Sequence, residues 1–296
     1  MTLSQSILAT LIYHDIFNYP LAKEEIHKYL IGKISSFAPV SSSVDRLVKL
    51  RKIESTNDFI FLKNRIKITK LRGIRRNYSK IKLKRAILFS NMLKIIPTLN
   101  LVAVSGALAM ENSHKNDDID LVLVSAKNTI WTTRFLASIL LWPYRRRPSG
   151  KKISNKACLN LFIDESDLKI QPQNLYLAHE ICQMKPLWNR NGTYQKFLKA
   201  NSWVKTFLPN WEPEKVKSGP VLDRVETRSG KSKFFSSLIT HNSSLAEELL
   251  KSFQLLYMRS KITTERIGKT QLFFHPAGTQ ESVLSEYQRR LKKLRI

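Results

Sequence analysis

The stretch from Leu101 to Ser125, LVAVSGALAMENSHKNDDIDLVLVS, constrains the fold of this chain more than any other part of the sequence. Leu101–Val104 and Leu121–Val124 are short apolar runs, which predicts two buried strands. Ser105-Gly106 follows the first run. A glycine there lets the backbone approach a ligand closely and frees N–H groups at a helix start, an arrangement that suits a phosphate.

Two carboxylates open the second predicted strand. In Asp118-Ile119-Asp120, alternation along a strand places both aspartates on one face and directs Ile119 into the core. Carboxylates held side by side repel each other unless a cation lies between them, and a hard divalent ion such as Mg²⁺ is the natural partner. The alternative is a surface turn in which Asp117 and Asp118 are merely solvated. The glycine, the spacing and the two strands together favour a site.

This pattern resembles the nucleotidyltransferase superfamily that includes DNA polymerase beta. Members carry a Gly-Ser or similar pair after one strand and, about ten residues later, an Asp-x-Asp that opens the next strand. Here the pair is inverted to Ser105-Gly106 and is followed by Ala107. The resemblance implies an α+β fold with a mixed sheet and helices. It also implies transfer of a nucleoside monophosphate from an NTP, with ATP expected, to an acceptor hydroxyl that the sequence does not identify.

The resemblance also implies roles for individual residues. Asp118 and Asp120 would be the catalytic carboxylates and would bind Mg²⁺ or Mn²⁺. Ser105 and the backbone N–H groups of Gly106 and Ala107 would hold the β- and γ-phosphates of the nucleotide.

A third carboxylate of the family projects from a strand that corresponds to Ala157–Asp164, ACLNLFID. Alternation predicts that Cys158, Asn160, Phe162 and Asp164 share one face of this strand. The expected carboxylate is therefore either displaced to Asp164, as third metal ligand or base, or replaced by Asn160. This departure keeps a second hypothesis open: a weak or inactive transferase-fold protein that serves as a nucleic-acid-binding regulator or scaffold. A transferase that modifies a partner protein is a third.

Residues 1–65 are predicted to form a mainly helical, winged-helix-like domain. Helices are expected over residues 3–16, 21–30 and 41–52, the last with three serines as possible caps, and a short hairpin follows over residues 53–62. In a winged helix the third helix is the recognition helix, and four of its side chains could contact phosphates: Arg46, Lys49, Arg51 and Lys52. Packing of this module against its own catalytic domain or a partner protein is equally compatible.

The chain is strongly basic, with 50 Lys and Arg residues against 23 Asp and Glu residues and a formal charge of +27. Such a balance predicts attraction to polyanions, although a lysine-rich composition of the source organism would give the same value. Arg65 to Arg85 contains ten basic residues and no acidic one, within a predicted connecting helix over residues 66–96 that could be interrupted at Gly73. A second basic surface is the loop 145–152, in which Arg145, Arg146 and Arg147 are the residues to test. Both surfaces could equally be simply solvated.

The remaining boundaries follow from composition. A nucleotidyltransferase domain is expected over residues 97–211, a Pro- and Gly-broken linker over 212–243, and a C-terminal helical region over 244–296. Helices are expected within these segments near residues 130–141, 175–185, 194–207, 244–260 and 281–294. His179-Glu180 lies in one of them and is expected to have a structural or supporting role, because adjacent helical residues point in different directions.

The protein is expected to be cytoplasmic. Cys158 and Cys182 provide neither a disulfide framework nor a zinc cluster, and the first residues lack the basic and cleavage regions of a signal peptide. The most apolar segment, residues 130–143, is too short to span a membrane and contains Arg134, so a buried helix is predicted there.

Overall fold

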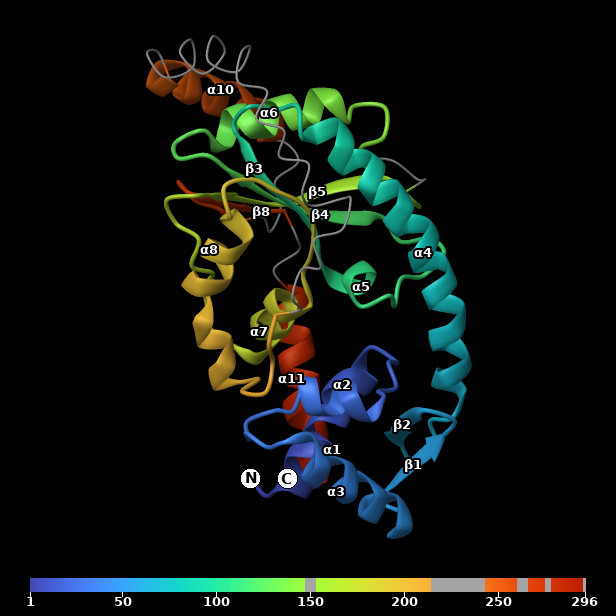
Figure 1. Cartoon of the computed structure of the whole chain (residues 1–296). Coiled ribbons are helices and arrows are strands. Elements are labelled where there is room, and N and C mark those ends of the chain that lie inside the picture. The colour runs from blue at the N-terminus through green and yellow to red at the C-terminus, as the bar shows by residue number, and fades with distance from the viewer. Residues whose placement is uncertain (147–152, 214–242, 260–265, 275–277, 295–296) are drawn as a thin grey trace.

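The computed structural model describes residues 1–146, 153–213, 243–259, 266–274 and 278–294 (Figure 1). The chain begins with a module of three helices and a hairpin, in the predicted order. Its elements are α1 (Leu3–Ile16), α2 (Lys23–Lys28), α3 (Phe37–Lys49), β1 (Ile53–Thr56) and β2 (Phe59–Leu62). Leu21 also pairs with Ile60 of the hairpin, so the chain between the first two helices is joined to the wing.

The third helix begins earlier than predicted. Its N-cap is Ser36, and Pro39 lies in its first turn, where a missing N–H costs no helical hydrogen bond. Residues 41–43, the three serines expected to cap the helix, therefore lie inside it. Val40, Val44 and Leu47 are buried against the rest of the module, which fixes the helix over this longer stretch.

A single long helix, α4 (Lys67–Leu93), connects this module to the rest of the chain. It continues through Gly73, where the sequence suggested an interruption, because a glycine weakens a helix by only about 1 kcal/mol. Its C-terminal half buries Ala86, Phe89 and Leu93 against the central sheet. Figure 1 shows α4 running along one side of the molecule from the sheet to the hairpin.

The central sheet is mixed, as predicted, and has six strands among the described residues. In chain order they are β3 (Leu99–Val104), β4 (Ile119–Ser125), β5 (Ala157–Asp164), β6 (Lys185–Asn189), β7 (Arg266–Ile267) and β8 (Gln271–Phe273). Their spatial order is β6-β3-β4-β5-β8-β7. The pair β4–β5 is parallel and the other neighbours are antiparallel. The three strands expected from apolar runs are present, whereas β6, β7 and β8 were not foreseen.

Helices cover both faces of this sheet. One face packs against α4 and α6 (Ile130–Leu140), and α10 (Ser243–Met258) lies on α6. The other face, on which Val122 and Ile163 lie, packs against α7 (Leu175–Gln183) and α8 (Thr193–Ala200). A short helix α5 (Gly106–Ala109) follows β3, and a 3₁₀ turn, η1 (Ser202–Thr206), follows α8 in place of the single helix expected near residues 194–207.

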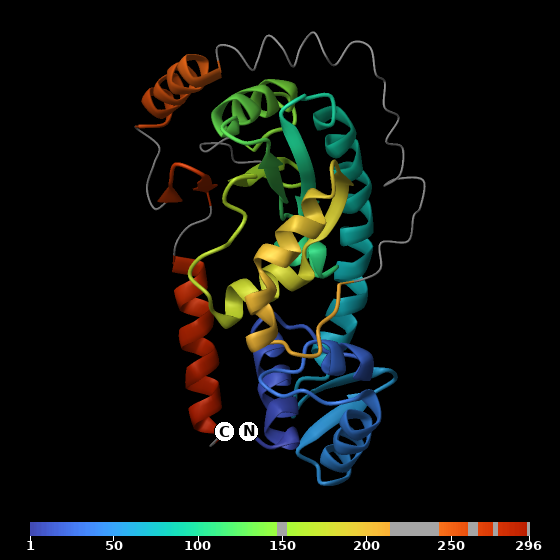
Figure 2. The ribbon, with the colours of Figure 1, turned by 60° about the vertical axis from the view of Figure 1, so that its left-hand side comes forward.

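The C-terminal segment contributes to several parts of the fold. The Glu247 carboxylate of α10 accepts hydrogen bonds from the backbone N–H groups of Trp131 and Thr132 at the start of α6. The strands β7 and β8 extend the sheet beyond β5, and α11 (Gly278–Lys293) packs against α1 and α7 (Figure 2). Most of the predicted linker over residues 212–243 lies outside the described residues.

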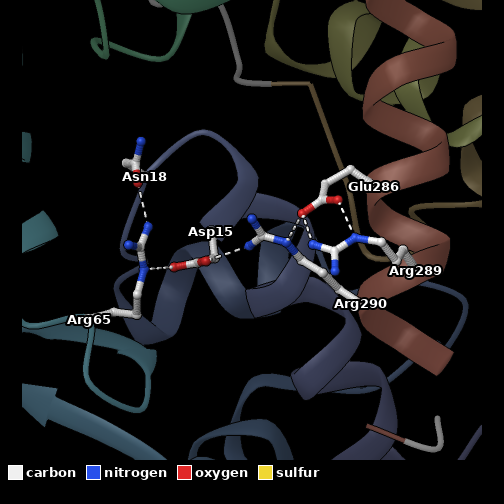
Figure 3. A network of polar contacts seen from close by, with 6 residues as sticks. All are labelled: Asp15, Asn18, Arg65, Glu286, Arg289 and Arg290. Carbon is white, nitrogen blue, oxygen red and sulfur yellow. Dashed lines mark hydrogen bonds and ion pairs between the residues drawn. The ribbon is translucent and has the colours of Figure 1, made fainter. Parts of the chain in front are cut away.

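A buried carboxylate joins α11 to the N-terminal module (Figure 3). Asp15 of α1 pairs with Arg65 at 2.7 Å and with Arg290 of α11 at 2.6 Å, and its side chain is only 7% exposed. Glu286 holds Arg290 from the other side at 2.6 Å. Three segments that are far apart in the sequence therefore meet at one charge network.

Within the described parts of the chain, none of the helices has the length and apolar character needed to cross a membrane. The predicted buried helix near residues 130–143 is α6, which ends at Leu140 and buries Ile130, Trp131 and Ala137 in the core.

Candidate functional site

Asp118 and Asp120 come together at the start of β4. Ile119 between them is completely buried, and this anchors the strand and leaves both aspartates on its other side. Asp120 shares its face with Val122, and the Asp118 side chain is 13% exposed. Carboxylate oxygens of the two residues lie within 4.8 Å of each other. Two acidic groups at this separation form a strongly negative site.

The Ser105-Gly106 turn lies directly beside these carboxylates. Gly106 has φ +60°, and a Cβ built on it would be 3.6 Å from Oδ2 of Asp120. The Ser105 backbone N–H donates to the carbonyl oxygen of Asp120 at 3.4 Å, so the turn is joined to β4. Ser105 is buried and Ala107 is exposed. The positive φ explains why glycine is needed at this turn.

The third position of the acidic cluster is occupied by a cysteine. Cys158 of β5 lies opposite Asp120 in the β4–β5 pairing, and its Sγ is within 4.8 Å of oxygens of both aspartates. Burial, and then the charges of Asp120 and Asp118, raise the pKa of the Cys158 thiol well above its ordinary value. The thiol therefore stays protonated and is a weak ligand for a hard cation.

Neither residue expected to supply the third carboxylate does so. The register of β5 shifts by one residue between Leu159 and Leu161, which makes Asn160 the extra residue of a bulge. The prediction that Cys158 to Asp164 alternate on one face is therefore wrong. Asn160 is buried and lines a cavity on the same face of the sheet as Asp120.

Asp164 lies at the opposite end of the β4–β5 pair, where it is paired with Ser125. Its carboxylate accepts hydrogen bonds from the Asn128 N–H at 2.7 Å, the Ser166 N–H at 2.9 Å and the Ser166 hydroxyl at 2.6 Å. The structure thus places Asp164 away from Asp118 and Asp120, in a position where it orders the turn after β5.

A cavity of about 350 Å³ lies on the same face of the sheet as Asp120. Its polar lining includes Ser105, Asn160, Tyr176 and Glu180. Its walls are mainly apolar and come from the sheet, from α7 and from Phe273 of β8, and the first turn of α11 forms one side. This volume is within the range of small-molecule sites. The C-terminal segment is therefore part of the site.

Glu180 is the residue that the sequence interpretation undervalued. Burial and the charge of Asp120 raise the pKa of Glu180 to about 7, although a hydrogen bond from the Gly106 N–H acts in the opposite direction. Tyr176, one helical turn earlier, faces the same cavity. The i, i+4 spacing of Tyr176 and Glu180 was the available signal. His179 has the expected structural role, since it is buried and stacks on Tyr13 with ring centroids 4.1 Å apart.

Arg146 is the basic residue that reaches the site. Its Nη1 lies 2.8 Å from Oδ2 of Asp118, and its side chain is 44% exposed. Arg145 is one residue earlier, beside Trp142, and Arg147 lies outside the described residues, as does most of the predicted basic loop.

The basic run on α4 is only partly available to a polyanion. Arg72 pairs with Glu25 at 2.7 Å, Arg75 donates to the Phe17 carbonyl, and Lys82 is buried against carbonyls of the 115–117 turn. Arg65 and Arg76 also form ion pairs. On α3, Arg46 donates to Ser4, whereas Lys49 is exposed, as are Arg51 and Lys52 just beyond the helix.

Comparisons with models of protein families, with curated proteins and with solved structures find no match to this chain. Any functional assignment depends on the residues and geometry described above.

Proposed function

We propose that this protein is a Mg²⁺-dependent nucleotidyltransferase that moves a nucleoside monophosphate from an NTP to an acceptor hydroxyl. The observation that carries the proposal is the convergence of Asp118 and Asp120 beside the Ser105-Gly106 turn, at the start of a central strand. This combines a cation site with a backbone turn that can approach phosphates, which is the arrangement expected in a polymerase beta-like fold.

The donor atoms at the site fit a hard divalent ion. Mg²⁺ retains several waters and needs only one or two protein carboxylates beside the substrate phosphates. Asp118 and Asp120 meet that need, although Cys158 remains a thiol. They would hold Mg²⁺ or Mn²⁺, which when bound neutralises phosphate charge and activates the acceptor oxygen.

The surrounding residues have roles that follow from their positions. Ser105 and the backbone N–H of Ala107, an exposed residue, would contact the β- and γ-phosphates. The Gly106 N–H, which donates a hydrogen bond to Glu180, would be shared between Glu180 and the phosphates. A Glu180 with a pKa of about 7 is partly protonated at neutral pH, which limits its repulsion of a phosphate. Arg146 balances the charge of Asp118 and, being half exposed, can turn toward the triphosphate. Asp164 takes no part.

The adjacent cavity would hold the non-phosphate part of a substrate. Its mainly apolar walls and small volume suit a base, a sugar or a small acceptor better than a folded polymer. A reducing, cytoplasmic setting is part of the same proposal, because Cys158 and Cys182 are both free thiols.

The test is turnover of labelled NTPs with Mg²⁺ in the presence of cell extract, followed by pyrophosphate release and by mass spectrometry of adducts. The Asp118→Ala/Asp120→Ala variant should lose turnover by at least about 100-fold while its circular dichroism spectrum is unchanged. Asp58→Ala, in the exposed hairpin turn, is the control and should retain turnover. Wild-type turnover in the double variant would refute the site.

One observation favours a second candidate function. Cys158 lies where a third carboxylate is expected, and Glu180 already accepts a hydrogen bond from the Gly106 N–H. Both features would weaken a catalytic site, whereas a regulator or scaffold with the transferase fold could tolerate them. Such a protein would give neither adduct nor pyrophosphate with any NTP. A salt titration of DNA and RNA binding would then measure its attraction to nucleic acid.

A further inference from the structure

Apolar side chains recur every seven residues along the outward side of α4. Ile74, Ile81 and Leu88 are on the helix, and Ile95 is just beyond its end. Their exposed fractions are 41%, 64%, 61% and 65%. Three residues before each of them lies a second set, which consists of Leu71, Tyr78, Arg85 and Met92. We call these eight residues the α4 stripe. The alternating three- and four-residue spacing is that of the a and d positions of a coiled coil.

The fold uses little of this stripe: Tyr78 and Met92 are half-buried, and Met92 packs against the core, whereas the other six residues are exposed. The residues that α4 buries against the sheet, Ala86, Phe89 and Leu93, lie on a different side of the helix from Ile81 and Leu88. A Cβ built on Gly73, at the start of the stripe, would meet no atom within 4 Å. From Leu71 to Met92 the stripe covers roughly 30 Å of helix. Large apolar side chains exposed in a continuous row mark a surface that another molecule covers.

The charges around the α4 stripe define its partner. No acidic residue occurs between Phe59 and Met110. Lys70 and Lys84 flank the stripe at g-type positions, and Lys67 lies in line with its d-type row, one turn before Leu71. All three lysines are exposed, and among the described residues none of them forms an ion pair. Arg85 interrupts the row at an a-type position, where a coiled coil uses a charged residue to fix register and partner.

We propose that the α4 stripe docks an amphipathic helix of a partner protein whose apolar face is bordered by Asp and Glu, with a carboxylate opposite Arg85. The partner helix would pack its apolar residues between Ile74, Ile81 and Leu88 and pair its acidic flanks with the bordering lysines. This docking site contains neither Asp118 nor Asp120, and the proposal does not depend on the proposed transferase activity.

Two other occupants fit less well. A second copy of this chain would bring two lysine-bordered stripes together, which like-charge repulsion opposes. Nucleic acid would be attracted by the lysines but would leave the exposed Ile81 and Leu88 in water. Half of the basic residues between Arg65 and Arg85 are also already paired within the protein.

The experiment uses two synthetic four-heptad helices and a single-stranded RNA oligonucleotide as fluorescent probes with the full-length protein. One peptide has Leu at a and d and Glu at e and g; the other keeps every Glu and replaces every Leu with Ser. At physiological salt, the Leu peptide should bind at least about tenfold more tightly than the Ser peptide. Ile81→Ser/Leu88→Ser should remove that difference, whereas Leu249→Ser, on the exposed side of α10, should not.

Each contrary result overturns the proposal. Equal binding of both peptides would mean that charge alone attracts them. Binding of RNA with no binding of either peptide would assign α4 to nucleic acid. A dimer seen by analytical ultracentrifugation and abolished by Ile81→Ser/Leu88→Ser would show that a second copy covers the stripe. Failure of NTP turnover in the wild-type protein would leave these readouts unaffected.

Discussion

The two ends of the parallel pair β4–β5 carry the same kind of side chain in opposite situations. At the start, Asp118 and Asp120 lie within 4.8 Å of each other and of a protonated thiol. At the far end, the Asp164 carboxylate accepts hydrogen bonds from the N–H groups of Asn128 and Ser166. The first end concentrates negative charge, and the second end neutralises its single charge with backbone dipoles.

The comparison shows that an aspartate near a site must be judged by what its oxygens already bind. Hydrogen bonds from Asn128, from the Ser166 N–H and from its hydroxyl use the acceptor capacity of Asp164, so this residue holds a turn together. Asp118 forms an ion pair with Arg146, a half-exposed side chain that can move away, and Lys82 adds a second positive charge nearby. Capacity for a cation therefore remains at the start of the strands and not at their far end.

The largest expected effect that would test this contrast is at the far end. Asp164→Ala removes the buried carboxylate that accepts hydrogen bonds from the Asn128 N–H, the Ser166 N–H and the Ser166 hydroxyl, so the free energy of unfolding should fall by about 3 kcal/mol. Urea denaturation measures this loss. Turnover per folded molecule should be unchanged, and a variant that folds normally but loses turnover would place Asp164 in the site.

A smaller effect is expected from Glu180, which adds a third negative group at the start of the strands. Its pKa in the folded protein, about 7, exceeds its ordinary value of 4.5, so the folded state binds the extra proton between these values. Stability should therefore fall as the pH rises from about 4.5 to about 7 and stay low above that range. Glu180→Gln should be more stable than the wild type by about 1–3 kcal/mol at alkaline pH and equal to it in acid.

Thermal and urea denaturation in the presence of EDTA, at pH values on both sides of this range, measure the effect. Asp58→Asn, in the exposed hairpin turn outside the cavity, is the control and should retain the wild-type pH dependence. A wild-type stability that rises toward alkaline pH would contradict the assignment of charge repulsion to this end.

The smallest effect is expected at Cys158. Cys158→Asp places a third carboxylate opposite Asp120 and should raise the affinity for Mg²⁺ about tenfold, as measured by calorimetry. Cys158→Ser keeps the size of the side chain without adding charge, and its affinity should match that of the wild type. Equal affinities of all three proteins would show that Asp118 and Asp120 are not the cation ligands.

The sequence was sufficient for the elements that have strong local patterns. The apolar runs before Ser105 and after Asp120 predicted β3 and β4, and the Gly106 turn and the pair of aspartates followed from spacing. The order of the N-terminal helices and hairpin was also predicted. These features depend on side-chain periodicity within short segments, which a single sequence contains.

Other parts of the site depend on pairing between segments and could not be read from the sequence. The bulge at Asn160 comes from the pairing of β5 with β4, and it places Phe162 and Asp164 on the opposite face of the strand from Cys158. The strands β7 and β8 have two and three residues, too few to show alternation. Lys185–Asn189 contains Pro186, which favoured a helix end over the edge strand that it forms.

The pairing of β5 with β8 has a consequence for biosynthesis. Leu161 pairs with Phe273, about 110 residues later, and Phe273 also closes part of the cavity. At a synthesis rate of roughly 5–20 residues per second, β5 waits at least several seconds on the ribosome with one edge unpaired. The nascent chain thus has the start of β4 long before it has a closed pocket. An unfinished chain would therefore expose both its acidic cluster and the unpaired edge of β5. An unpaired strand edge can pair with other chains, so this is the form of the protein that chaperones would have to protect.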